Sequence, residues 1–172
     1  MNIKFGHVAI VGRTNVGKST LLNALMGEKV AIVSSRPQTT RTRLLGFFTE
    51  ERGQAVFFDT PGLHKPEFLM NRRMVQAAES ALLEADLILA IFEAPGPLGP
   101  GDRYFLQQLE GKQAPVIAVI NKIDRCDKDA LFPLIAELNE SGRFADIIPV
   151  SALQKDNLDR SEERRVGKEC RL

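Results

Sequence analysis

Gly12-Arg13-Thr14-Asn15-Val16-Gly17-Lys18-Ser19 is the stretch of this sequence that decides the fold. It matches the pattern G-x-x-x-x-G-K-[ST], and it joins the apolar run His7–Val11 to the amphipathic stretch Ser19–Met26. A strand, a glycine-rich turn and a helix in this order are typical of a phosphate-binding loop. The glycines let successive backbone N–H groups point at one anion, and the helix N-terminus adds a partial positive charge. The alternative is a strand–helix turn that glycine merely caps.

Two side chains of this loop are suited to a nucleoside triphosphate. Lys18 would place a full positive charge on the terminal phosphates as a catalytic residue, and Ser19 would offer its hydroxyl to Mg²⁺. The rest of the loop and the residue after it complete the predicted phosphate site: Gly12, Arg13, Thr14, Asn15, Val16, Gly17 and Thr20.

Short apolar runs alternate with helical patterns along the chain. The runs are rich in Val, Ile and Phe, and their short, continuous character favours strands that are buried on both faces. They are His7–Val11, Ala55–Phe58, Ala85–Phe92, Val116–Ile120 and Asp146–Val150. Helices are expected over Ser19–Met26, over Leu69–Leu83, after Asp102 as an N-cap, and over Leu131–Leu138 with Gly142 closing it.

This alternation predicts an α/β fold. We expect a three-layer sandwich with a mostly parallel six-stranded sheet and helices on both faces. Leu44–Phe48 would add one antiparallel strand, which meets Ala55–Phe58 across a hairpin turn at Glu50–Gly53. Pro95–Gly101 is interpreted as a stiff loop within the domain, because the pattern resumes after it.

The composition fits one globular domain. The chain has 172 residues, 44% of them hydrophobic and 26% charged, and its formal net charge of +1 does not suggest wholesale nucleic-acid binding. Two cysteines, Cys126 and Cys170, are too few for a disulfide scaffold or a zinc cluster. No apolar run is long enough to span a bilayer, and the N-terminus lacks a signal-peptide pattern. These features predict a cytoplasmic protein without a transmembrane segment.

A second motif, Asp59-Thr60-Pro61-Gly62, follows the apolar run Ala55–Phe58. An Asp at the carboxyl end of a strand beside the phosphate loop can hold Mg²⁺ through a water. Gly62 lets its backbone N–H approach a γ-phosphate, and we count it among the catalytic residues. The pattern D-x-x-G also fits any tight turn. We interpret it as a nucleotide-binding motif because it directly follows a strand predicted to be buried. Thr60, Pro61 and Leu63 belong to the same predicted nucleotide contact.

The segment Lys29–Thr49 contains four basic residues and no acid. The simplest interpretation is a solvated loop. The alternative is a loop that folds over phosphates, in which Thr40 completes the Mg²⁺ shell and contributes to catalysis when a γ-phosphate is present. Such a loop would order on triphosphate binding and relax on hydrolysis.

The segment Asn121-Lys122-Ile123-Asp124 follows another buried apolar run. The Asp124 carboxylate can accept both N1–H and the 2-amino group of guanine, a donor pair that adenine lacks. Asn121 can tie this segment to the phosphate loop, and the stem of Lys122 can lie along the base. Ser151 and Ala152, after the last predicted strand, would complete the pocket through their backbone.

In this order the motifs resemble those of the translation-factor-like P-loop GTPases over residues 6 to about 159. The strings GRTNVGKSTLLNAL, SSRPQTTRTR, DTPGLHKP and NKID look like those of the Era family of bacterial ribosome-assembly GTPases. The pair PQTTR and DTPGLHKP narrows the resemblance to that family. Related tRNA-modification GTPases share the TTR element, so a domain of that kind is the neighbouring alternative.

The resemblance implies a Mg²⁺-dependent GTPase that hydrolyses GTP to GDP and phosphate and acts as a nucleotide switch in small-ribosomal-subunit assembly. It also implies ribosomal RNA as a partner and peripheral membrane association. Leu63 stands where many GTPases have a water-orienting glutamine, and relatives with an asparagine matching Asn15 can use K⁺ beside the phosphates. The family usually has Asp at the position of Glu93. Era proteins also carry a C-terminal KH RNA-binding domain, which this sequence does not encode.

Residues 160–172 do not fit the pattern. The string RSEERRVGKEC, residues 160–170, has little apolar periodicity and looks like a translated sequencing-adapter string. The alternative is a divergent terminal helix. We therefore expect a GTPase domain over residues 1–159, truncated before its last helix, and a non-native tail after it.

Two other functions are weighed against GTP hydrolysis. A nucleotide-gated binding module with negligible turnover is favoured mildly by Leu63, because a leucine side chain cannot orient water. An ATP-using P-loop kinase is disfavoured by Asp124. His7, His64 and Cys126 are interpreted as structural or loop residues.

Overall fold

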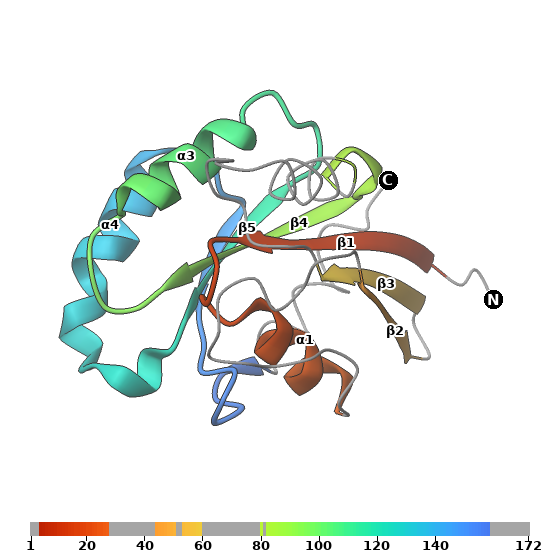
Figure 1. The fold of residues 1–172 in the computed structure, drawn as a ribbon, viewed down its shortest axis with the longest axis horizontal. Helices are drawn as coiled ribbons and strands as arrows, with labels where there is room; N and C mark the ends of the chain where they lie inside the picture. Colours follow the sequence, from red (N-terminus) through yellow and green to blue (C-terminus); the bar gives the residue numbers. More distant parts are fainter. Residues whose placement is uncertain (1–3, 28–43, 51–52, 60–79, 81, 159–172) are drawn as a thin grey trace.

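The computed structural model describes residues 4–27, 44–50, 53–59, 80 and 82–158. Its centre is a six-stranded sheet with the strand order β2-β3-β1-β4-β5-β6 (Figure 1). All neighbouring strands are parallel except β2 and β3, which are antiparallel as the hairpin prediction requires. The strands are β1 (Lys4–Gly12), β2 (Leu44–Glu50), β3 (Gly53–Asp59), β4 (Leu87–Glu93), β5 (Val116–Asn121) and β6 (Asp146–Pro149). The predicted fold class is confirmed.

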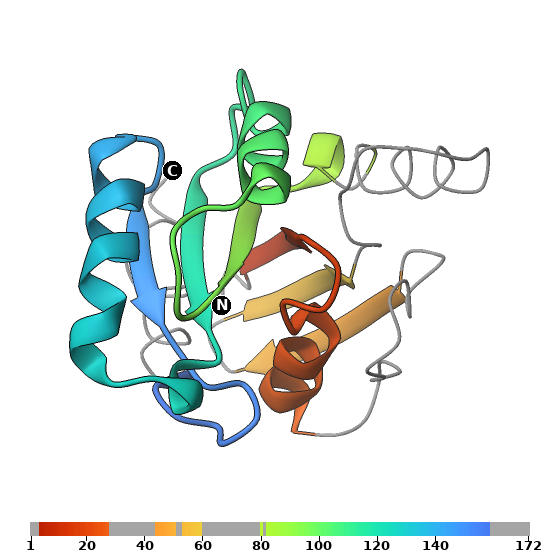
Figure 2. The same cartoon turned by 60° about the vertical axis from the view of Figure 1, so that its left-hand side comes forward.

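Helices cover the two faces of this sheet. Helix α1 (Lys18–Met26) lies on one face, and α3 (Pro100–Gln108) and α4 (Phe132–Glu140) lie on the other (Figures 1 and 2). Two short 3₁₀ turns, η1 (Ile123–Arg125) and η2 (Lys128–Leu131), connect β5 to α4. Of the predicted helix Leu69–Leu83, only residues 80 and 82–83 lie within the described part, and they are helical.

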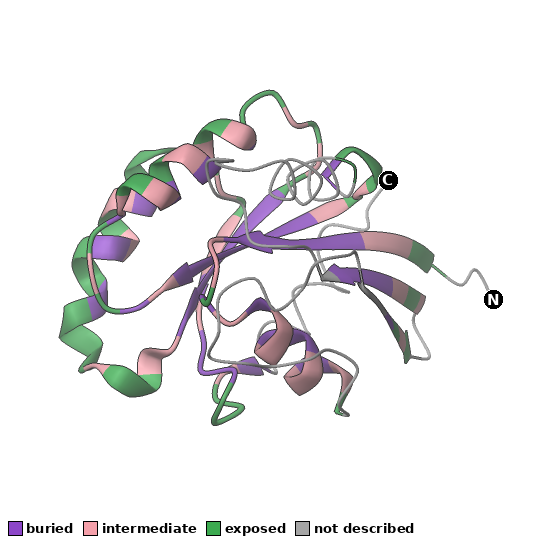
Figure 3. Cartoon of the chain, in the orientation of Figure 1, coloured by how far each residue is buried: buried purple, intermediate pink, exposed green. Residues whose placement is uncertain are grey.

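Each central strand contributes to two separate hydrophobic cores. In β1, Val8 and Ile10 pack with α1, whereas Ala9 and Val11 belong to the core beneath α3 and α4. Because successive side chains of a strand point to opposite faces, a strand between two helical layers must be apolar at every position. Figure 3 shows the result, with the central strands largely buried and the outer faces of α3 and α4 exposed. Fully burying one Val, Leu, Ile or Phe side chain contributes about 1.5–3 kcal/mol.

Helix α3 begins earlier than the sequence pattern indicated. Asp102 was predicted to be its N-cap, but the N-cap is Gly99, and Asp102 is the third helical residue. Pro100 fits the first helical position because its fixed φ suits a helix and its missing N–H needs no partner there. The Asp102 carboxylate reaches back and accepts the N–H of Gly99 at 2.9 Å. The loop predicted over Pro95–Gly101 therefore ends at Gly99.

The other element boundaries differ by at most two residues, except that β1 begins at Lys4, three residues before the predicted start. Strand β4 begins at Leu87, and the backbone N–H of the preceding Asp86 donates to the carbonyl of His7 at 2.8 Å. Helix α4 ends at Glu140, and Gly142 follows with φ 62°, a left-handed conformation that glycine adopts without strain. Within the described residues, no helix combines the length and the apolar character that crossing a membrane requires.

Candidate nucleotide-binding site

The predicted motifs meet at one edge of the sheet. Strands β1, β4 and β5 are parallel neighbours, and β1 and β5 each lead into a candidate segment at the carboxyl end. The backbone of Gly12 pairs with Ile91, and that of Glu93 pairs with Asn121. Ligands of open α/β sheets bind outside the carboxyl ends of such strands. This edge is therefore the candidate site.

Both motif glycines of the phosphate loop are required by its shape. Gly12 has φ 155° and Gly17 has φ 100°, conformations that residues with a side chain rarely adopt. A Cβ on Gly12 would lie 2.5 Å from the carbonyl oxygen of Ile91, and a Cβ on Gly17 would lie 2.2 Å from Nδ2 of Asn121. Gly17 is also the N-cap of α1, so the chain turns there directly into the helix. The glycines thus allow both the turn and the close approach of β4 and β5.

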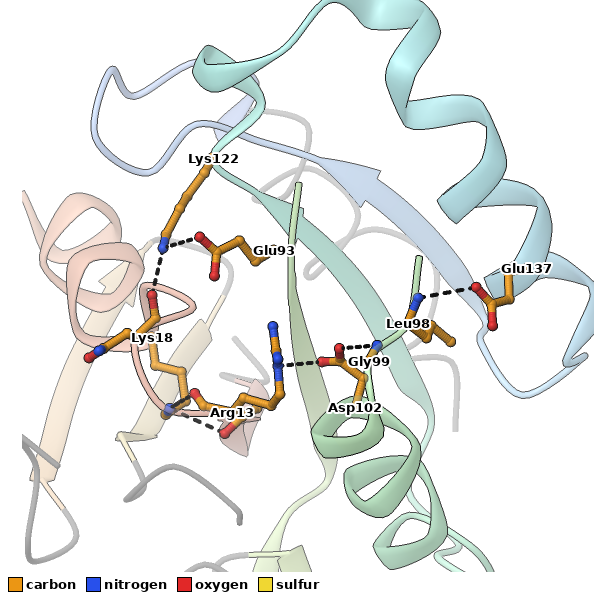
Figure 4. Close-up of polar contacts among 10 residues, drawn as sticks. Arg13, Lys18, Glu93, Leu98, Gly99, Asp102, Lys122 and Glu137 are labelled. Carbon is orange, nitrogen blue, oxygen red and sulfur yellow. Dashed lines mark hydrogen bonds and ion pairs between the residues drawn. The ribbon is translucent and has the colours of Figure 1, made fainter. Parts of the chain in front are cut away.

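Lys18 lies folded back over its own loop. Its residue is 7% exposed, and its Nζ donates to the carbonyl oxygens of Gly12 at 3.2 Å and Arg13 at 2.6 Å (Figure 4). A buried ammonium group needs such acceptors, because leaving its charge without partners is costly. The structure thus places the predicted cationic residue at the first turn of α1, the end of a helix where backbone N–H groups lack intrahelical acceptors.

Asn121 is the central tie of the site. Its residue is 2% exposed, its Nδ2 donates to the carbonyl of Val16 at 2.8 Å, and its Oδ1 accepts the N–H of Ala152 at 3.0 Å. One amide therefore connects the phosphate loop, β5 and the segment after β6. The predicted tie between Asn121 and the phosphate loop is confirmed.

Lys122 reaches the phosphate loop as well. Its Nζ donates to the carbonyl of Asn15 and to Oε1 of Glu93, both at 2.6 Å (Figure 4). Asn15 and Lys122 both have positive φ, 62° and 69°. Arg125 lies 3.6 Å from the same Glu93 oxygen. From the sequence alone, Glu93 stood out only as a departure from a family pattern, and its pairing with Lys122 was missed. The available signal was an acid at the end of β4, the strand that pairs with β5.

Asp124 and Ser151 are joined directly. The Ser151 hydroxyl donates to Oδ1 of Asp124 at 2.5 Å and accepts the N–H of Gln154 at 3.1 Å. Ser151 is 1% exposed, whereas Asp124 is exposed to solvent. Ser151 was predicted to act only through its backbone, and the structure adds a role for its side-chain hydroxyl. It holds one carboxylate oxygen of the residue that was predicted to read the base.

Arg13 turns away from the loop's interior. Its Nε lies 2.9 Å from Oδ1 of Asp102 on α3, an ion pair whose angle is not that of a hydrogen bond (Figure 4). Its backbone carbonyl stays in the loop and accepts Lys18. The remaining predicted loop residues, Thr14, Val16, Ser19 and Thr20, lie between β1 and α1 or in the first turn of α1, and Val16 is fully buried.

Several predicted site residues lie outside the described part of the structure. These are Thr40, Thr60, Pro61, Gly62 and Leu63, together with His64. Asp59 ends β3, and its backbone pairs with Ile10 of β1, two residues before the phosphate loop. Ser19 and Asp59 are therefore at the same edge of the sheet. Hydroxyl and carboxylate oxygens suit Mg²⁺, so these two residues fit the predicted metal site.

Cys126 has no catalytic character. Burial raises the pKa of its thiol above the ordinary value, and the carboxylates of Asp127 and Asp124 raise it further. A thiol with a raised pKa is a poor nucleophile at neutral pH. His7 packs against Phe58 with ring centroids 5.4 Å apart and lies 3.4 Å from Asp86. Both contacts agree with the structural interpretation of this histidine.

A phosphate loop at the end of β1, tied by Asn121 to an N-K-x-D segment, defines the class of P-loop nucleotide-binding domains with the GTPase arrangement of motifs. The family described as 50S ribosome-binding GTPase matches residues 7–122. The chain belongs to that family.

Within this family the chain is similar to proteins named GTPase Era. The GTPase Era of Clostridioides difficile (strain 630) is 48% identical over 157 residues, which are 91% of this chain and 53% of that protein. A crystal structure of Era in complex with MgGDPNP and nucleotides 1506–1542 of 16S ribosomal RNA superposes with a TM-score of 0.91 and 40% identity, covering 96% of this chain and 57% of that one. A single-residue variant of Aquifex aeolicus Era bound to GDP.AlF4- gives a TM-score of 0.90 at 40% identity, over 95% and 56% of the two chains. The chain thus spans about half the length of these relatives.

Proposed function

We propose that this chain is an Era-type GTPase domain that binds GTP and hydrolyses it to GDP and phosphate. The observation that carries the proposal is the Asn121 amide, which joins the phosphate loop at Val16 to Ala152. The neighbouring Ser151 in turn holds Asp124 through its hydroxyl. A phosphate loop alone would fit many nucleotides. Its rigid connection to an acid that matches the guanine donor pair favours GTP and GDP over adenine nucleotides.

The residues have distinct proposed roles in this reaction. Lys18 would neutralise charge on the terminal phosphates, and Ser19, Thr40 and Asp59 would hold Mg²⁺, with Asp59 acting through a water. When bound, Mg²⁺ neutralises phosphate charge and orients the terminal phosphate. The Gly62 N–H would donate to the γ-phosphate. Asn15, which is exposed at the loop, would help to hold K⁺, and this cation would offset developing negative charge.

The relatives support a proposed biological setting. An Era crystal structure contains MgGDPNP and a 16S ribosomal RNA fragment, and this supports a role for our chain as a cytoplasmic nucleotide switch in small-ribosomal-subunit assembly. Ribosomal RNA is a proposed partner. Peripheral membrane association and the division into residues 1–159 and 160–172 stay predictions from the sequence.

Nucleotide binding and multiple turnover test the proposal. We expect fluorescent GDP to bind in the presence of Mg²⁺, to be displaced by GTP, and to be displaced only weakly by ATP. Sustained phosphate release over many turnovers distinguishes a GTPase from the alternative, a nucleotide-gated binding module with negligible turnover, which Leu63 favours. Equal displacement by ATP and GTP would contradict the base-reading role of Asp124.

A further inference from the structure

Asp102 on α3 is a buried carboxylate that faces the phosphate loop. Its residue is 4% exposed, and its Oδ1 lies 2.9 Å from Nε of Arg13 (Figure 4). The other oxygen, Oδ2, accepts the N–H of Gly99 at 2.9 Å. One side chain therefore caps α3 and also pairs with the second residue of the loop. Burying a carboxylate is costly unless it is paired, so both contacts matter to the fold.

The first turn of α3 is shaped to receive Arg13. A Cβ on Gly101 would lie 2.7 Å from Cδ of Arg13, and a Cβ on Gly99 would lie 3.5 Å from its Nη1. A side chain at position 101 would thus push Arg13 away from Asp102. The absence of a side chain at Gly101 lets the arginine lie across the helix terminus, whereas a Cβ on Gly99 would make an ordinary van der Waals contact.

This first turn is itself held in place by α4. Glu137 accepts the backbone N–H of Leu98 at 3.2 Å (Figure 4). It also pairs with Arg103 at 3.1 Å. Phe105 of α3 and Leu138 of α4 are fully buried in the same core. The first turn of α3, where Arg13 binds, is therefore held by contacts with α4 and by the core that α3 and α4 share with the sheet.

Arg13 passes this restraint on to Lys18. The Arg13 carbonyl accepts Nζ of Lys18 at 2.6 Å, a shorter contact than the 3.2 Å to the Gly12 carbonyl. Restraining the arginine side chain restrains the peptide that holds the lysine. The restraint runs from a carboxylate on one face of the sheet to the cation at the start of α1 on the other.

A second acid, Glu93, lines the same pocket as Arg13 and is the alternative partner to Asp102. Glu93 lines the same pocket of about 220 Å³ as Arg13 and Asp102, but it is occupied by Lys122 at 2.6 Å. Asp102 thus pairs with Arg13, whereas Glu93 already has Lys122 and Arg125 as basic partners. Without the charge of Asp102, Arg13 would be free to compete with Lys122 for Glu93.

We infer that Asp102 is a positioning residue for nucleotide phosphates, acting through Arg13 to fix the start of the phosphate loop and the ammonium of Lys18. This inference rests on the proposed function, because it requires that the loop bind a nucleotide.

The direct test is the GDP affinity of the Asp102→Asn variant of the full chain. Asparagine keeps the size of the side chain and an oxygen for the Gly99 N–H, but it removes the charge that holds Arg13. We expect the Kd for GDP to rise about tenfold. The control is Glu110→Gln, which removes the exposed 2.7 Å pair with Arg143 just beyond α3 and should leave the Kd within twofold.

A double-mutant cycle tests the route through Arg13. In an Arg13→Gln background, the further change Asp102→Asn should have little effect on the Kd for GDP, because the partner is already gone. The preference for GDP over IDP should stay the same in all variants, since base reading by Asp124 is untouched. A general loss of structure would lower that preference as well.

The outcomes separate the two proposals. If the parent chain does not bind GDP, the proposed function fails and the inference falls with it. If the parent binds and Asp102→Asn binds within twofold of it, or if the two substitutions act additively, the inference alone is wrong. Should circular dichroism show that Asp102→Asn is unfolded, Arg13→Gln alone replaces it. This variant removes the charge that pairs with Asp102, and an unchanged Kd for GDP would overturn the inference.

Discussion

Replacing Asn121 by alanine should destabilise the whole domain as well as its site. The substitution leaves two buried backbone groups without their partners, the carbonyl of Val16 and the N–H of Ala152, on residues that are 0% and 3% exposed. Each unsatisfied buried group costs about 1–3 kcal/mol. The sum is about 2–6 kcal/mol, and we expect the lower end because a water can enter the space that the amide leaves. For a chain of this size, each kcal/mol shifts Tm by about 2–4 °C, so a loss of about 2–3 kcal/mol lowers Tm by about 4–12 °C.

Thermal unfolding of the nucleotide-free protein, followed by circular dichroism, measures this effect. The matched control is Asn139→Ala, which makes the same chemical change at an exposed position on α4. It should leave Tm unchanged or raise it slightly, because alanine favours a helix. If Asn121→Ala melts within about 1 °C of the control, a shift well below the range expected for two lost partners, the amide does not hold the two loops together and the reasoning on the site is wrong.

Four further perturbations test separate parts of the site. Gly17→Ala should lower Tm more in the parent than in an Asn121→Ala background, where the 2.2 Å clash is gone; equal losses would contradict the clash. Asp124→Asn should shift affinity from guanine toward xanthine nucleotides in competition binding, because one of its two acceptors becomes a donor, and an unchanged preference would exclude it from base reading. GTP turnover should be faster in KCl than in matched NaCl, and the difference should vanish in Asn15→Ala; equal rates would remove K⁺ from the mechanism. Since burial raises the pKa of Cys126, iodoacetamide should label it more slowly at a mildly alkaline pH than it labels glutathione, and equal rates would show an ordinary thiol.

The fold was predictable because its signals are local. The strands around the two cores are apolar at almost every position, and glycines mark the turn from β1 into α1. Hairpin pairing of β2 with β3 also followed from neighbouring residues. The start of α3 was missed because Asp is a residue type that often caps helices. The geometry shows instead that Gly99 is the N-cap and Pro100 the first helical residue.

The side-chain partners within the site were less predictable. Residue types and motif order identified Lys18, Asn121 and Asp124, but not the contacts of Glu93 with Lys122 or of Ser151 with Asp124. These pairs are separated by 29 and 27 positions, and they meet only because parallel strands bring their carboxyl ends together. No local pattern encodes such pairs. The sequence therefore indicates that the site lies at the carboxyl ends of the strands, but not which side chains pair with one another there.

The long sequence separation of the ties around the phosphate loop has a consequence for how the domain folds. Asn121 and Val16 are 105 positions apart, and Lys122 and Asn15 are 107 apart. Because closing such long loops is entropically costly, we expect these contacts to form only after β4 and β5 have joined β1, late in assembly. A ligand that recognises only the completed site stabilises the native state without stabilising the folding transition state. It therefore lengthens the lifetime of the folded protein and leaves the folding rate unchanged.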